Sequence, residues 1–282
     1  MIQPKPPVFP SNITKFQAGE YTATPDLLAV EEPLEIQLNF IENEEIVQKT
    51  VAITMRTPGN DFELALGFLF GEGIITSMQE VIRIRYCESI KKPEERGNVV
   101  KVTLRPHVKV NLQRLERHFY TNSSCGVCGK TSIEALEISG CPVMHSNQLK
   151  IKSEVLTSLP DKLREVQSLF QHTGGIHAAA LFNNQGTLIT SREDVGRHNA
   201  MDKLIGSQIE SPEKMQNMVV LVSGRLSFEL VQKAIAAQIP LIAAVGAPSS
   251  LAVQLATTYH MTLVGFLRNE HFNVYTMPDR VI

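Results

Sequence analysis

Apolar residues in the first half of the chain recur at the spacing of half-buried strands. They occupy every second position over residues 34–40 and again over 51–55. A period of two predicts two strands with one buried face each, joined through the polar stretch at 42–45. The turn sequence PGND at 58–61 then supplies helix-capping residues ahead of an apolar run at 62–73, which predicts a short helix.

Longer apolar runs alternate with amphipathic segments in the second half. The pattern predicts, in order, a helix at 158–175 with Pro160 in its first turn, two strands about a turn at 183–186, a helix at 196–206, a strand at 218–224, a helix at 227–238, a strand at 241–246, a helix at 249–260 and strands at 262–268 and 273–276. Continuous apolar strands between such helices indicate a largely parallel sheet covered on both faces.

These two patterns of apolar positions predict two domains. The first half gains strands at 81–86 and 99–104 and a helix-like piece at 112–119, so we expect it to be α+β. A boundary near 140–155 divides the chain into an N-terminal α+β region, residues 1–150, and an α/β domain, residues 151–282.

Composition narrows the class of protein. The chain has 282 residues, of which 43% are hydrophobic, and a formal net charge of −2 from 27 basic and 29 acidic residues. Such a balance creates no overall field that would attract nucleic acid or an anionic membrane. The start MIQPKPPVFP lacks the apolar core of a signal peptide, and no apolar run approaches the ~18 residues of a membrane-spanning helix. We therefore expect a cytoplasmic protein.

Three predicted strand ends carry residues suited to binding an anion, at 223–225, 246–250 and 265–269. Ligands of open α/β sheets bind beyond the carboxyl ends of the strands, where glycine allows close approach and arginine can grip phosphate. Ordinary strand-to-helix turns use the same residues. Because Arg225 and Arg268 are expected on one edge, we favour a phosphate site.

A second polar cluster precedes a predicted helix, in the sequence SREDVGRHNAMDK at 191–203. It could form part of a site, or it could be a solvated helix start that favours acidic residues in its first turn. His177 opens a strand just past a glycine pair and is a weaker candidate of the same kind.

The stretch TNSSCGVCGK at 121–130 contains the pair Cys125 and Cys128. Together with Cys141 and His145 it reads C-x2-C-x12-C-x3-H, a spacing that suits tetrahedral zinc. Flanking glycines and a following lysine equally favour an accessible loop with reactive thiolates for redox or persulfide chemistry. The spacing alone leaves both alternatives open. A zinc deaminase is excluded, because it needs H-x-E followed by P-C-x-x-C, and the strand that His177 opens has no such glutamate.

Seven blocks of sequence, in order along nearly the whole chain, resemble the FdhD family, the sulfur-carrier accessory proteins of formate dehydrogenase. They are EEPLEI (31–36), MRTPGNDFELALGFLFGEGII (55–75), SSCGVCGK (123–130), TGGIHAAALF (173–182), REDVGRHNAMDKLIG (192–206), SGRLSFELVQKA (223–234) and GFLRNEHFNVYT (265–276). The resemblance implies a cytosolic homodimer whose second half is a three-layer α/β/α domain, like cytidine deaminase but without its zinc.

The resemblance also implies a function. The family accepts persulfide sulfur from a cysteine desulfurase and passes it to the molybdenum bis-guanine-dinucleotide cofactor, before that cofactor enters formate dehydrogenase. By this resemblance Cys125 is the persulfide carrier and Cys128 its loop partner. The stretch matching the family's cofactor-binding segment comprises Phe266, Leu267, Arg268, Asn269, Glu270 and His271. Arg225 joins this set as a phosphate partner.

No zinc is expected, because Cys141 and His145 fall where the resemblance is thin. The alternative is a zinc-stabilised nucleotide-binding module without sulfur chemistry.

Overall fold

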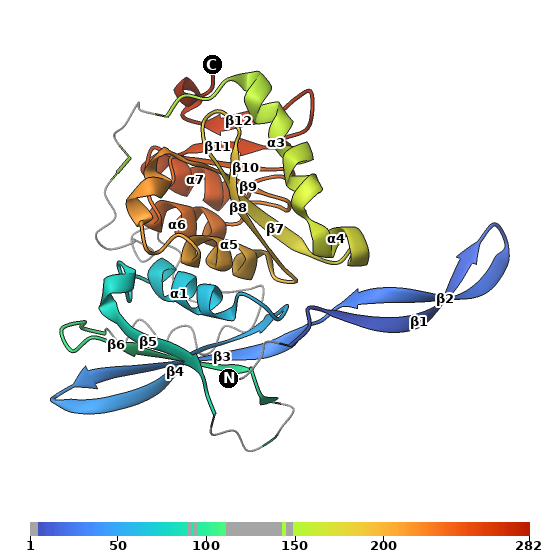
Figure 1. Cartoon of the computed structure of the whole chain (residues 1–282). Coiled ribbons are helices and arrows are strands. Elements are labelled where there is room, and N and C mark those ends of the chain that lie inside the picture. The colour runs from blue at the N-terminus through green and yellow to red at the C-terminus, as the bar shows by residue number, and fades with distance from the viewer. Residues whose placement is uncertain (1–4, 89–91, 93–94, 111–142, 145–148) are drawn as a thin grey trace.

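The computed structural model describes residues 5–88, 92, 95–110, 143–144 and 149–282. In it a small unit built on a four-stranded sheet lies beneath a larger unit built on a six-stranded sheet (Figure 1). No helix in these ranges is long and apolar enough to cross a membrane. The predicted domain boundary at 140–155 falls partly outside the described residues and stays a prediction.

The small unit follows the predicted pattern closely. Its strands are β3 (Glu32–Glu42), β4 (Glu45–Arg56), β5 (Val81–Tyr86) and β6 (Val99–Leu104), in the spatial order β4-β3-β6-β5. Within the described ranges one helix, α1 (Asp61–Gly71), covers one face, and a 3-10 turn (Met78–Glu80) precedes β5. The alternating residues Leu34, Ile36 and Leu38 are fully buried beneath α1, because period two places them all on the inner face.

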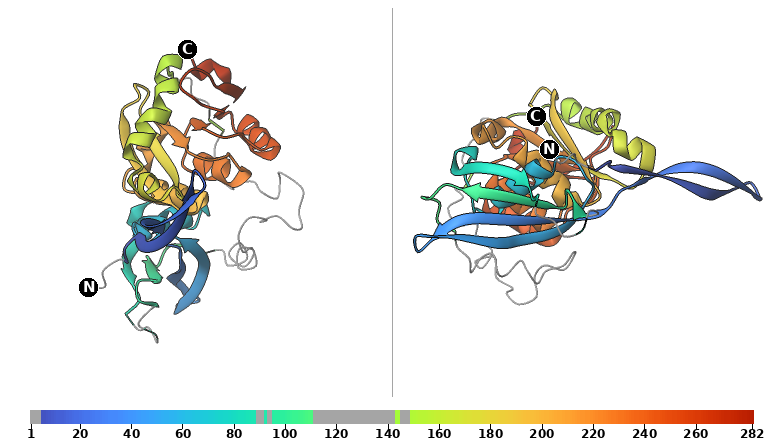
Figure 2. Two further views of the ribbon diagram at one scale, coloured as in Figure 1. Left: turned by 90° about the vertical axis from the view of Figure 1, so that its right-hand side faces the viewer. Right: turned by 60° about the horizontal axis from the view of Figure 1, so that its bottom comes forward.

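An N-terminal hairpin was not predicted. Strands β1 (Val8–Gln17) and β2 (Glu20–Ala29) pair along their whole length and project away from both units (Figures 1 and 2). Prolines are uncommon in strands, so the sequence pattern does not indicate a hairpin in this segment. Pro10 and Pro25 are tolerated because a two-stranded ribbon has an outer edge on each strand, where no amide donor is needed.

The large sheet is mixed rather than largely parallel. Its order is β12-β11-β10-β9-β7-β8, and its strands are β7 (His177–Phe182), β8 (Leu188–Asp194), β9 (Val219–Val222), β10 (Leu241–Ala244), β11 (Thr262–Gly265) and β12 (Asn273–Thr276). Only β9, β10 and β11 are parallel. The prediction was wrong at both edges, where the links β7–β8 and β11–β12 are too short for the crossover that parallel strands require.

Helices cover this sheet on both faces, which confirms the three-layer prediction. One face carries α5 (Arg197–Gly206), α6 (Phe228–Ala236) and α7 (Ser250–Thr258), and the other carries α3 (Ser153–Val166) and α4 (Ser168–Thr173) (Figure 1). Short 3-10 helices span Pro212–Asn217 and Pro278–Arg280.

The predicted helix at 158–175 is two helices. It begins at Ser153 and breaks at Gln167, so Pro160 lies inside α3 rather than in its first turn. An interior proline removes one backbone hydrogen bond. The helix continues through it because Leu156, Leu159 and Leu163 form one buried stripe against the sheet.

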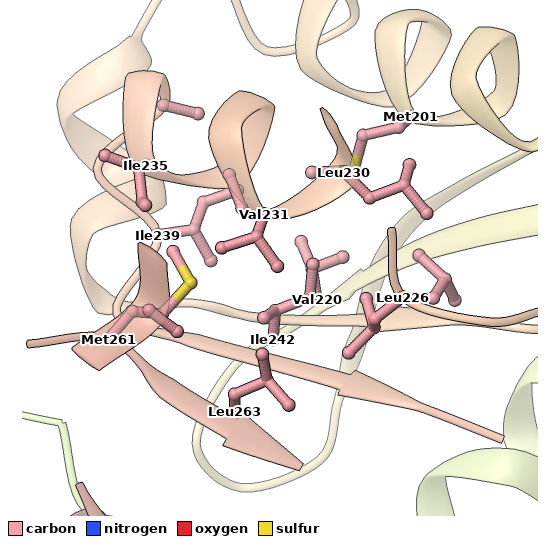
Figure 3. Close-up of a cluster of buried hydrophobic side chains, with 14 of the residues drawn as sticks. Met201, Val220, Leu226, Leu230, Val231, Ile235, Ile239, Ile242, Met261 and Leu263 are labelled. Atoms are coloured by element: carbon pink, nitrogen blue, oxygen red, sulfur yellow. The ribbon is translucent and has the colours of Figure 1, made fainter. Parts of the chain in front are cut away.

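Two hydrophobic clusters hold the layers together. The larger lies between the sheet and α5–α7, where Val220, Ile242 and Leu263 of the strands meet Leu230 and Val231 of α6 (Figure 3). Each of these side chains is completely buried. Burying an aliphatic side chain of this size stabilises a fold by about 1.5–3 kcal/mol, so this cluster contributes strongly to the stability of the unit.

Candidate functional site

The three predicted strand ends lie side by side. The Gly246 amide donates to the Gly224 carbonyl at 3.1 Å, and the Phe266 amide donates to the Gly246 carbonyl at 3.0 Å. Gly246 has no room for a side chain, because a Cβ there would lie 2.9 Å from the Gly224 oxygen. The prediction of a shared edge is therefore confirmed for 223–225, 246–250 and 265–269.

A groove of about 890 Å³ opens at this edge. Asp161, Arg164 and Phe170 of α3 and α4 form one wall, and residues 267–271 form the other. His177 and Ser223 lie between them. This volume is within the range of pockets that bind small molecules and cofactors, about 300–1,000 Å³.

The predicted segment 266–271 contributes unevenly to the groove. Arg268, Asn269, Glu270 and His271 are exposed and line it, whereas the Leu267 side chain is fully buried in the core below. Phe266 is outside the groove lining, although it is partly exposed and adopts a left-handed backbone with φ of 54°. Such a backbone is costly for a bulky residue and is commonly retained at functional sites.

One contact spans the groove. Asn269 Nδ2 donates to Asp161 Oδ2 at 2.9 Å, linking the loop after β11 to α3. The Arg268 amide donates to the His271 carbonyl at 2.9 Å, which closes the loop into a tight turn. Asp161 was missed by sequence reasoning, because nothing in an amphipathic helix shows which exposed carboxylate faces a distant loop.

Arg225 lies on the same edge but not in the groove. It follows β9, is exposed, and its Cα is 3.1 Å from where a Cβ on Gly246 would be. It is absent from the groove lining, unlike Arg268. The two arginines therefore share an edge, as predicted, without converging in one cavity.

His177 is at the centre of this edge. It opens β7 and packs against Gly224, where an added Cβ would be 3.2 Å from His177 Nδ1. Burial lowers the pKa of His177 below its ordinary value, and electrostatic interaction with Arg197 and His198 lowers it further. The imidazole is therefore held neutral near pH 7 and can both donate and accept a hydrogen bond.

His198, at the start of α5, meets two partners through one nitrogen. Its Nε2 lies 3.0 Å from Ser227 Oγ and 2.9 Å from Glu229 Oε2. Hydrogen bonding to His198 lowers the pKa of Glu229. A Ser-His-acid relay needs its partners on different ring nitrogens, so this trio is not a nucleophilic triad.

The rest of the cluster at 191–203 is structural. Asp194 is fully buried and accepts from the Thr57 amide at 3.1 Å and from Lys203 Nζ at 2.7 Å. Arg192 pairs through two nitrogens with Glu63 of α1. The contacts with Thr57 and Glu63 join the two units. Both partners lie more than a hundred residues earlier in the sequence, so the local pattern could not reveal them.

The cysteines stay untested. Cys125, Cys128, Cys141 and His145 lie outside the described residues, so neither the persulfide loop nor the zinc spacing is decided by the structure. Within the described ranges, no three His, Cys, Asp or Glu side chains gather as metal ligands.

Comparison with known proteins points to one family. Residues 29–282 match the model of the FdhD/NarQ family. The chain is 47% identical over 272 residues to the sulfur carrier protein FdhD of Streptomyces coelicolor, covering 95% of this chain and 94% of that one. It is 43% identical to the FdhD of Saccharolobus solfataricus, with 96% of both chains covered.

A solved structure agrees with these relatives. It is a crystal structure from Desulfotalea psychrophila assigned as a formate dehydrogenase accessory protein. The two structures superimpose with a TM-score of 0.70 at 26% identity, over 98% of this chain and 100% of the other.

Proposed function

Because this chain belongs to the FdhD/NarQ family, we propose that it is a sulfur carrier protein, a sulfurtransferase that serves formate dehydrogenase. The observation that carries the proposal is the near full-length similarity to curated sulfur carriers from bacteria and an archaeon. The matched residues include both the cysteine segment and the groove edge. The working location is the cytoplasm, where a cysteine desulfurase is the sulfur donor.

Sulfur loading takes place on Cys125 in this proposal. The Cys125 thiolate attacks the outer sulfur of the donor's persulfide. A new S–S bond forms on Cys125, the donor's S–S bond breaks, and the donor leaves as a thiolate. Cys128 then attacks the inner sulfur, which closes a Cys125–Cys128 disulfide and releases hydrosulfide. The disulfide accounts for the two electrons that reduce the transferred sulfur.

The sulfur acceptor is the molybdenum bis-guanine-dinucleotide cofactor, bound as a substrate at the groove edge. Its pyrophosphates need cations and backbone amides, and Arg268 and Arg225 are exposed on this edge. A guanine base presents both hydrogen-bond donors and acceptors, and Asn269 and the neutral His177 can pair with such groups. The described residues therefore fit the chemistry of this ligand.

Intact-protein mass spectrometry after incubation with a cysteine desulfurase and cysteine tests the proposal. The expected result is a gain of one sulfur atom that a reductant removes. The Cys125→Ala protein should gain none, while Cys128→Ala should still be loaded, because Cys128 acts only after the sulfur is on Cys125. Equal loss in both variants together with stoichiometric bound zinc and lost folded stability would replace the sulfur carrier with the zinc-stabilised module.

A further inference from the structure

Two polar side chains in the groove lining hold each other in a fixed arrangement. Asn269 Nδ2 donates to Asp161 Oδ2 at 2.9 Å, and both residues line the groove. This bond uses one of the two amide hydrogens of Asn269 and one lone pair of a carboxylate that has two oxygens. The pair therefore still offers a ligand one amide hydrogen and acceptor positions on both oxygens of Asp161.

These remaining groups form a row of one donor followed by two acceptors. Along the pair they are the second N–H of Asn269, then Asp161 Oδ2, then Asp161 Oδ1. The order follows from the bond itself, because Oδ2 is the oxygen that accepts from the amide and so lies next to it. An ionised carboxylate can only accept, so neither oxygen can change its role to suit a ligand.

The same row is present on the pairing edge of cytosine, which has an amino group beside two acceptors. Its complement is guanine, whose edge carries the O6 acceptor, the N1–H donor and the N2 amino donor in that order. Adenine would place its amino group against the Asn269 amide and its N1 lone pair against the Asp161 carboxylate. The pair therefore suits guanine and opposes adenine.

The surrounding groove has groups that suit any nucleotide. Phe170, on the same wall as Asp161, is 38% exposed and lines the groove. Stacking of a base on an aromatic ring does not depend on which base it is. Arg164 and Arg268 also line the groove, and arginine binds phosphate whatever base is attached. Choice between bases therefore depends on the groups that meet the base edge.

Asp161 and Glu270 are the two carboxylates in the groove lining of the described residues. Glu270 is exposed, and no side-chain hydrogen bond within the described ranges orients it. Asp161 is already oriented by Asn269. Because ordering a mobile side chain costs free energy on binding, the oriented carboxylate is the better suited to recognise a base.

Resting on the proposed function, which places a guanine-containing ligand at this edge, we propose that Asp161 determines base specificity. Its carboxylate accepts hydrogen bonds from N1–H and the N2 amino group of guanine, while Asn269 donates to O6 and keeps the carboxylate in place. Asp161 belongs to α3, so the site extends beyond the segment 266–271 to the opposite wall of the groove. It meets the base and not the sulfur, so it selects the ligand without taking part in the transfer.

Isothermal titration of the full chain with four nucleoside diphosphates tests the proposal. Guanosine diphosphate should bind most tightly. Inosine diphosphate lacks the N2 amino group and should bind about ten- to a hundred-fold more weakly, because one hydrogen bond to a charged group is lost. Adenosine and xanthosine diphosphates should bind more weakly still, since each turns an acceptor atom towards the carboxylate.

Asp161→Asn replaces the last acceptor of the row with a donor. The Asn oxygen can still accept from N1–H, whereas its amide now suits the C2 oxygen of xanthine and opposes the amino group of guanine. The preference should therefore reverse, with xanthosine diphosphate bound about ten-fold or more tightly than guanosine diphosphate. Glu270→Gln removes the same charge from the opposite wall and should leave the order of the four nucleotides unchanged. Both side chains are exposed, and thermal unfolding verifies that each variant is folded.

Equal affinity of the wild-type chain for guanosine and adenosine diphosphates would overturn the proposal, and so would binding of none of the four. An Asp161→Asn chain that keeps the wild-type preference would overturn it as well. Sulfur loading of Cys125 is measured separately by mass spectrometry. Reversed base preference in a chain that never gains sulfur would speak only against the proposed function, whereas normal loading with unchanged preference in the Asp161 variant would speak only against this assignment.

Discussion

Asp161 and Asn269 lie on opposite walls of the groove, and Asn269 Nδ2 donates a hydrogen bond to Asp161 Oδ2 across it at 2.9 Å. Arg268, in the same segment as Asn269, lines the groove and forms no ion pair with any side chain in the described ranges. His177, which also lines the groove, is held neutral by burial and by the Arg197 guanidinium. The proposed function therefore gives phosphate binding and base recognition to different residues of one edge.

Arg268→Ala should weaken binding of a guanine nucleotide by about ten- to a hundred-fold, because a charge-assisted hydrogen bond contributes roughly 1.5–3 kcal/mol. Arg225→Ala should weaken it too, but less, since Arg225 is outside the groove. Isothermal titration at two salt concentrations measures both effects. Arg83→Ala, an exposed arginine on β5, is the control. Unchanged affinity in both groove-edge variants would place the nucleotide elsewhere.

The His177 imidazole should titrate below its ordinary pKa of about 6.5 in an NMR experiment that follows its ring protons. Because the folded-state pKa is lowered, the folded chain binds this proton less readily than the unfolded chain. The contribution of His177 to stability is thus fully present above pH ~6.5 and is lost as the pH falls through its folded pKa.

Arg197→Ala provides the matched test of the cause. Removal of that cation should move the His177 titration upward, since Arg197 lowers the pKa. A titration midpoint at or above the ordinary value in the wild-type chain would contradict the neutral assignment.

At the scale of elements, α1 and α5 approach each other very closely. A Cβ at Gly67 would lie 1.8 Å from the Asp202 carbonyl oxygen, and one at Gly206 would lie 1.9 Å from the Glu63 oxygen. The two helices therefore meet backbone to backbone. This contact joins the small unit to the large one, because each helix lies on the sheet of its own unit (Figure 1).

Gly67→Ala should destabilise the chain by about 1–3 kcal/mol or more, because the helices must separate to admit the methyl group. Gly71→Ala in the same helix is the control. Its added Cβ would be 3.4 Å from the flexible Lys233 Nζ, and alanine is the better helix former. Chemical denaturation compares the two variants. Equal stability of Gly67→Ala and the wild type would mean that α1 and α5 are further apart than described.

At the scale of the whole molecule, buried charged side chains also connect the small unit to the large one. Lys203 Nζ donates to the Thr57 carbonyl at 2.8 Å and pairs with Asp194 at 2.7 Å, and both charged side chains are almost wholly buried. Thr57 belongs to the small unit, whereas Asp194 ends β8 of the large one. The two units are therefore expected to unfold in one cooperative transition.

Lys203→Met should cost about 3–5 kcal/mol, because it leaves the Asp194 carboxylate buried without its cation. It should also separate unfolding into two steps, as the link to Thr57 is lost. Calorimetry detects both effects. Lys214→Met removes an exposed lysine and should change neither. A single unchanged transition in the Lys203 variant would show that the α1–α5 contact and the Arg192–Glu63 pair couple the units without Lys203.

The sequence by itself determined most elements and their order. Strands β5 and β6 have the bounds predicted, and the helices after β8, β9 and β10 lie where the pattern placed them. Periodicity is a local property of burial, so it can be read without knowing what an element packs against. The shared edge of the three strand ends also followed, because parallel strands carry their carboxyl ends to one side.

The tertiary structure decided what depends on distant partners. Only packing shows that Asp194 and Arg192 bind the small unit, that Asp161 reaches Asn269, and that Arg225 lies outside the groove. The same holds for the antiparallel edges of the large sheet. It also holds for the β1–β2 hairpin, whose prolines weaken the sequence signal for strands. Each of these features is set by contacts between residues far apart in sequence, and a local pattern of polar and apolar positions carries no record of such contacts.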